Sequence, residues 1–158
     1  MQENNSFRFD GVENISANYD NILSIMTDES ALSKIFPGVK SIKKIEENAY
    51  FMSIKTPFWG LPGDIWARLE LECHREKILN KVKGSGVGST FELTISIEAL
   101  DKRTDSVTIK WVSDLVLNGR INNLPRSVID RTSRKIIKKV VTNLQNYVQN
   151  ADLNSGEL

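Results

Sequence analysis

The chain has 158 residues, a mass of 17.9 kDa and a formal net charge of +1. This length suits one domain, and a chain of this size buries roughly 70% of its unfolded surface. The near-zero charge gives no bulk attraction to a polyanion, so nucleic acid is not an expected partner. With 40% hydrophobic and 26% charged residues, the composition is typical of a globular protein and excludes a disordered or fibrous chain.

Few residues are available for metal or redox chemistry. Cys73 is the single cysteine and His74 the single histidine, so an internal disulfide and a multi-cysteine zinc site are excluded. The segment Met1 to Ser6 is polar, and no stretch approaches the ~18 consecutive apolar residues of a membrane span. We therefore expect a cytoplasmic protein without a metal or another cofactor.

The N-terminal part predicts one strand followed by two short helices. Residues 7–15 alternate apolar and polar side chains, as in a strand with one buried face. Ser16 is the expected cap of the first helix, and Asp28 begins the second, which ends at Phe36-Pro37-Gly38. The apolar sides of these helices consist of Tyr19, Ile22, Leu23, Met26, Leu32 and Ile35.

From Val39 onward the hydrophobic period changes to two. Six apolar runs predict six antiparallel strands joined by hairpin-like connections, near residues 39–45, 49–56, 64–73, 78–83, 89–99 and 106–117. No crossover helix interrupts them, which argues against a parallel sheet. Side-chain parity makes the sheet apolar on one face only; for example, Leu69 and Leu71 oppose Arg68 and Glu70. The glycines from Gly84 to Gly88 are expected to form a turn.

The run from Pro125 to Asn150 predicts one helix of about seven turns. Its apolar residues recur at three- and four-residue spacing, while Lys135, Lys138 and Lys139 lie on the opposite side. Such a helix needs a sheet to cover its apolar face, and a long helix across a curved sheet leaves a cavity between them. The prediction is an α+β fold in which residues 1–150 form a single domain and residues 151–158 a short, frayed polar tail.

Several short motifs occur in the order and spacing of a known family: Phe9-Asp10-Gly11, Phe36-Pro37-Gly38-Val39, Gly60 with Gly63, Gly84-Ser85-Gly86-Val87-Gly88, and Asn118-Gly119-Arg120 through Leu124 and Ile129-Asp130. With these motifs the chain resembles the START-like (SRPBCC, helix-grip) superfamily. Within it, the chain is similar to the carbon monoxide dehydrogenase CoxG family. The resemblance covers nearly the whole chain.

The resemblance implies a helix-grip fold, a seven-stranded antiparallel sheet curved around a long C-terminal helix, with two short helices after strand 1. It also implies an internal pocket for an apolar or lipid-like molecule. CoxG-like proteins often accompany molybdenum hydroxylases of the carbon monoxide dehydrogenase type as assembly or membrane-recruitment factors. Some members carry an apolar C-terminal extension that reaches the membrane. Only a few polar residues follow Gln149 here, so we expect at most peripheral membrane contact.

Ten residues are candidates for ligand binding in this cavity: Phe36, Met52, Ile54, Phe58, Trp59, Leu69, Phe91, Trp111, Arg120 and Asp130. For the aromatic and methionine side chains, filling the core is the alternative role. Arg120 and Asp130 are expected near one end of the cavity, where they would bind the polar end of an apolar ligand. A favourable contact with the helix macrodipole explains Asp130 equally well.

The loop from Thr56 to Gly63 is unusually apolar for a hairpin tip, because it contains Phe58, Trp59 and two prolines. Three roles are open for it. It forms a lid over the cavity, a docking surface for a partner or bilayer, or a segment that folds back and completes the core.

We expect the protein to bind a lipid or quinone-like molecule and to serve as an accessory factor for a molybdenum hydroxylase-type redox enzyme, whose subunits are its expected partners. It is expected to be a monomer or a weak homo-oligomer with Trp66 on its outer face. Two alternatives are a START-like cyclase or hydratase and an interaction module with a filled core. An enzyme needs two titratable groups in one pocket, and strand parity supplies almost none.

Overall fold

The structure is a computed structural model that describes residues 6–55, 63–86 and 88–156. Its strands are β1 (Ser6–Ile15), β2 (Val39–Glu46), β3 (Ala49–Lys55), β4 (Asp64–Cys73), β5 (Lys77–Gly86), β6 (Ser89–Lys102) and β7 (Val107–Gly119). Its helices are α1 (Tyr19–Met26), α2 (Glu29–Ile35) and α3 (Arg126–Gly156), with a short 3₁₀ helix, η2 (Arg120–Asn123), before α3.

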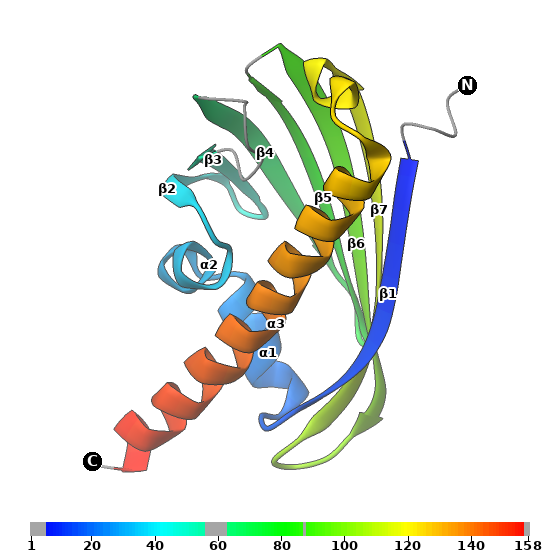
Figure 1. Ribbon diagram of the computed structural model, residues 1–158. Coiled ribbons are helices and arrows are strands. Elements are labelled where there is room, and N and C mark those ends of the chain that lie inside the picture. Colours follow the sequence, from blue (N-terminus) through cyan, green and yellow to red (C-terminus); the bar gives the residue numbers. More distant parts are fainter. Residues whose placement is uncertain (1–5, 56–62, 87, 157–158) are drawn as a thin grey trace.

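All seven strands join one antiparallel sheet in the order β1-β7-β6-β5-β4-β3-β2. From β2 to β7 each strand pairs with the next one along the chain. β1 is the edge strand beside β7, and the pairing runs from Ser6 opposite Val116 to Ile15 opposite Val107. Figure 1 shows the sheet curving around α3, which crosses its concave face, while α1 and α2 lie beside the C-terminal half of α3. This arrangement confirms the predicted helix-grip fold.

The two short helices begin where side chains can bond the free N–H groups of their first turns. Asn18 caps α1 by accepting a hydrogen bond from the Asn21 N–H at 2.8 Å, and Asp28 caps α2 by accepting from Ala31 N–H at 2.9 Å. The prediction that Asp28 caps the second helix is confirmed, whereas the prediction that Ser16 caps the first helix is wrong. The chain continues two residues further because Ala17 is buried in the core before α1 begins.

Two elements run further than their sequence patterns predicted. β5 continues through Gly84 and Gly86, which were expected in a turn, because they pair with Phe91 and Ser89 of β6. α3 continues six residues beyond Asn150 into the segment expected to fray. No proline or glycine stands between Asn150 and Gly156 to stop it.

The buried side chains form two clusters, one against the start of α3 and one against its middle and later turns. The larger cluster joins α1 and α2 to the adjoining strands and to Leu144 and Val148 of α3. The smaller cluster consists of Phe7, Phe9, Leu117, Ile121 and Ile129, where β1, β7, η2 and the start of α3 meet. The space between these two clusters contains the candidate site.

Gly119 ends β7 in a backbone conformation that only glycine adopts readily, with φ at +96°. An added Cβ would also overlap the carbonyl oxygen of Gly88. We expect Gly119→Ala to lower the unfolding free energy by about 2 kcal/mol or more, measured by urea denaturation. Lys110→Ala, an exposed position of the same strand, is the control and should change it by less than about 0.5 kcal/mol. Equal effects of both changes would contradict the strain at Gly119.

Tyr50 links β3 to the end of α1, because its buried hydroxyl donates a 2.7 Å hydrogen bond to the Thr27 carbonyl. Burial raises the pKa of this phenol. The stability it contributes is present below the ordinary value of about 10 and is lost as the pH rises through the raised pKa. We expect Tyr50→Phe to cost about 1 kcal/mol at pH 7 and to reduce the alkaline loss of stability. Denaturant titrations from pH 8 to 11 measure both, and equal losses in the two proteins would contradict this.

Candidate ligand-binding cavity

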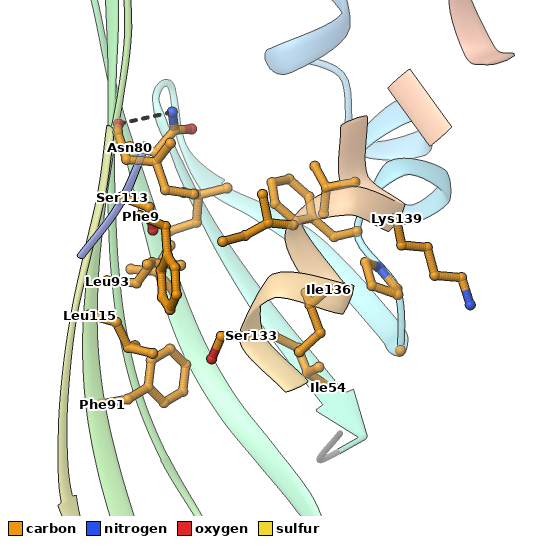
Figure 2. Close-up of a pocket in the computed structure, with 18 of the residues that line it drawn as sticks. Phe9, Ile54, Asn80, Phe91, Leu93, Ser113, Leu115, Ser133, Ile136 and Lys139 are labelled. Atoms are coloured by element: carbon orange, nitrogen blue, oxygen red, sulfur yellow. Dashed lines mark hydrogen bonds between the residues drawn. The ribbon is translucent and has the colours of Figure 1, made fainter. Parts of the chain in front are cut away.

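A cavity of about 620 Å³ lies between α3 and the concave face of the sheet. Figure 2 shows sheet residues such as Leu93 and Leu115 facing helix residues such as Ile136 across it. Apolar side chains make up most of its wall, including Phe91, Leu93, Ile95, Ile97, Ile109, Trp111, Leu115, Ile136, Ile137, Val140 and Leu144. Its volume falls within the range of small-molecule sites.

The side chains in the middle of the sheet do not fill the cavity. Leu93, Ile95 and Leu115 face the interior but are only half-buried, whereas Ile109 and Leu117, in the two buried clusters, are 4% and 3% exposed. The remaining apolar surface of the three middle residues faces the cavity. A filled interior, one of the alternatives considered from the sequence, does not fit these positions.

Six of the ten candidate residues line the cavity: Phe36, Met52, Ile54, Leu69, Phe91 and Trp111. Phe58 and Trp59, and with them residues 56–62 of the apolar loop, lie outside the described part of the chain. The six residues come from the α2–β2 connection and from β3, β4, β6 and β7. Strand parity therefore brought five of them to one face, and the Phe36-Pro37-Gly38 motif added the sixth.

Arg120 and Asp130 are not among the described residues that line the cavity. The Arg120 side chain packs against Gly88, and its backbone N–H donates to the Gly88 carbonyl at 3.0 Å. Asp130 accepts a hydrogen bond from Arg134 at 3.0 Å, one turn along α3, with 42% of its side chain exposed. The expected contact of these two residues with the polar end of a ligand has no support in this geometry.

The polar residues on the cavity wall are different ones. Asn80, Ser113 and Ser133 line the cavity and are buried. Asn80 pairs across the sheet with Ile95, which pairs with Ser113, so the amide and the hydroxyl lie in one row two strands apart. Side chains of β5 alternate between the two faces of the sheet, and the apolar Ile78 and Val82 mark the inner face. Asn80 lies between them on the same face, so its inward position was predictable from the sequence.

The cavity opens beside three lysines. Lys55, Lys135 and Lys139 line it and are exposed, and Figure 2 shows Lys139 extending away from the sheet, on the side opposite Asn80. We call these three residues the cationic mouth. They are the only titratable side chains among the described lining residues. The cavity therefore combines a long apolar wall with positive charge at its opening.

The basic residues of α3 thus have two separate roles. Arg126 lies over the Phe7 ring at 4.1 Å and donates to the Ser6 carbonyl at 2.7 Å, and Arg134 lies over the Phe9 ring at 5.0 Å. These contacts fasten the edge strand β1 to α3. Lys135 and Lys139 belong to the cationic mouth instead, so the basic residues of α3 do not form one uniform solvated face.

The single cysteine and the single histidine are not among the described residues that line the cavity. Cys73 is exposed at the end of β4. Partial burial raises the pKa of its thiol, which keeps it protonated at neutral pH. His74 is exposed beside it. Within the described residues, no group of histidine, cysteine and carboxylate side chains is arranged to hold a metal ion, and no helix is long and apolar enough to cross a membrane.

This architecture and sequence match a known family. The sequence profile of the carbon monoxide dehydrogenase CoxG family matches residues 11–149, which is most of the chain. The chain belongs to the CoxG family. The resemblance carried by the short motifs is thereby confirmed. No curated protein matches the chain.

Solved structures with the same fold share little sequence with this CoxG family member. A conserved protein from Geobacillus kaustophilus is 16% identical, with a TM-score of 0.82 over 92% of this chain and 97% of its own. A START superfamily protein from Mycobacterium smegmatis is 12% identical, with a TM-score of 0.72 over 91% and 98%. A norcoclaurine synthase from Thalictrum flavum is 13% identical, with a TM-score of 0.64 over 93% and 96%. These similarities establish the START-like fold alone.

The cationic mouth predicts a preference for anionic over neutral apolar molecules. Two fluorescent probes of similar shape test it, the anionic 8-anilinonaphthalene-1-sulfonate and the neutral N-phenyl-1-naphthylamine. We expect the double change Lys135→Gln and Lys139→Gln to weaken binding of the anionic probe about fivefold at low salt and to leave the neutral probe unaffected. Fluorescence titration measures both affinities.

Lys138→Gln is the matched control, because this exposed lysine of α3 does not line the cavity. It should change the affinity for neither probe. If Lys138→Gln weakened binding of the anionic probe as much as the double change does, general attraction to the helix surface, and not the cationic mouth, would account for the preference.

Proposed function

We propose that this CoxG family member binds a hydrophobic small molecule, of lipid or quinone type, between α3 and the sheet. The observation that carries the proposal is the apolar cavity of about 620 Å³ whose wall residues remain half-buried. Each 100 Å² of apolar ligand surface buried there would contribute about 2.5 kcal/mol, before the cost of ordering the ligand. Burial of apolar surface is thus sufficient to drive binding, and the few polar wall residues set the orientation.

The cellular role we propose is that of an accessory or assembly factor for a redox enzyme of the molybdenum hydroxylase type. Membership of the CoxG family supports this role. The exposed Arg131 and Lys138 of α3 lie close in sequence to the cationic mouth and offer basic surface to an acidic partner. A cytoplasmic location, at most peripheral membrane contact, and a monomeric or weakly associated state belong to the same proposal.

An enzymatic role is the second candidate, since a norcoclaurine synthase shares the fold. Acid–base catalysis needs titratable groups that face the bound substrate. Among the described residues of the wall, the lysines of the mouth are the only such groups, and neither carboxylates nor histidine accompany them. The lining therefore favours binding over catalysis as the function of this site.

Filling the cavity should abolish ligand retention. Leu115→Trp adds a large side chain on the inner face of β7, whereas Val116→Trp adds the same side chain at the next residue, on the outer face. We expect native mass spectrometry of gently extracted wild-type protein to detect a co-purifying apolar molecule, which Leu115→Trp loses and Val116→Trp keeps. The affinity for N-phenyl-1-naphthylamine should fall more than about tenfold in Leu115→Trp only.

Two results would overturn the binding function. One is wild-type protein that carries no small molecule and does not bind the neutral probe. The other is equal behaviour of the two tryptophan variants. The accessory role has its own test, affinity purification of the tagged protein from its native host. Co-purification of molybdenum hydroxylase subunits supports the role, and their absence under crosslinking conditions contradicts it.

A further inference from the structure

Two side chains of the described sheet line the cavity with a buried polar atom that lacks a hydrogen-bond partner: Trp111, whose donor Nε1 lies against Gly11, and Asn80, whose Oδ1 is an acceptor. Of the two, Asn80 needs a donor. It is 1% exposed, and its Oδ1 has no hydrogen-bond partner among the described residues. Its Nδ2 donates one long bond of 3.4 Å to the Ile95 carbonyl, drawn in Figure 2. An unpaired buried acceptor is costly.

The Ile95 carbonyl decides which end of the amide is free. A carbonyl oxygen only accepts hydrogen bonds, so it holds the donating Nδ2 beside it. Turning the amide over would place Oδ1 next to that carbonyl, bringing two acceptors together, and would leave Nδ2 without its bond. The amide orientation therefore rests on a neighbouring backbone group, and the atom left for a ligand is the acceptor Oδ1.

We propose that the ligand carries a neutral hydrogen-bond donor, a hydroxyl or an N–H group, at the end that reaches Asn80. The donor supplies the bond that Oδ1 lacks. It is neutral because no carboxylate is present among the described wall residues to balance an ammonium group, and burying an unpaired charge is costly. A carboxylate is excluded at this end because it offers acceptors only.

This inference rests on the proposed binding function and narrows its ligand class. A quinone presents carbonyl oxygens and no donor, whereas a hydroquinone or a lipid with a free hydroxyl presents the O–H that Asn80 needs. The opposite end of the ligand would lie toward the cationic mouth. The expected molecule is therefore apolar in its body and hydroxylated at its buried end.

A matched pair of probes tests the donor directly. 4-Octylphenol and 4-octylanisole have the same apolar body and the same oxygen, but only the phenol can donate a hydrogen bond. We expect wild-type protein to bind the phenol about tenfold more tightly, measured by displacement of N-phenyl-1-naphthylamine. Asn80→Leu, which is nearly isosteric, should weaken binding of the phenol until the two probes bind about equally.

Lys81→Ala is the control, because the next residue of β5 is exposed on the outer face; it should keep the wild-type preference. Asn80→Ala makes the same comparison if the leucine variant does not fold. A wild-type protein that binds both probes equally, or an Asn80 variant that keeps the preference, would overturn this inference and leave the binding function intact. Wild-type protein that binds neither probe would overturn both.

Discussion

The architecture depends on two separate contacts between α3 and the rest of the fold, one at the start of the helix and one around Leu144 and Val148. At the start, Ile129 packs with β1, β7 and η2. At the second contact, Leu144 and Val148 join the larger cluster, and Asn143 donates a 2.9 Å hydrogen bond to the Ile35 carbonyl at the end of α2. The sheet curves around the helix (Figure 1), and the cavity lies between the two contacts. The cavity is a consequence of how the helix is supported.

Two glycines keep the large aromatic side chains from occupying that space. The Trp111 ring lies over Gly11 of β1, and the Phe91 ring lies over Gly84 of β5, each so closely that a Cβ on the glycine would overlap the ring. Each ring therefore rests on a strand position that has no side chain of its own. Both aromatic residues line the cavity wall, and the glycines opposite them contribute no side chain.

The fold was predictable because its signals are periodic. Alternation along the strands and the three- and four-residue spacing of α3 fix which face of each element is buried, and the α2–β2 motif at Phe36 adds family information. Local hydrogen bonding is not periodic, so the Asn18 cap was misplaced. The roles expected for Arg120 and Asp130 stay predictions, because nearness to one end of the cavity in sequence does not tell which neighbour a charged side chain contacts. Asp130 finds Arg134, one turn away.

Asn80 and the cationic mouth lie on opposite sides of a mainly apolar cavity (Figure 2). The sheet side carries Asn80, with one unpaired acceptor, and the open side carries the cationic mouth on α3 and β3. An apolar wall alone would accept a ligand in either direction, since burial of hydrocarbon has no orientation. The two polar features remove that symmetry, so a bound molecule would present a defined end at the mouth.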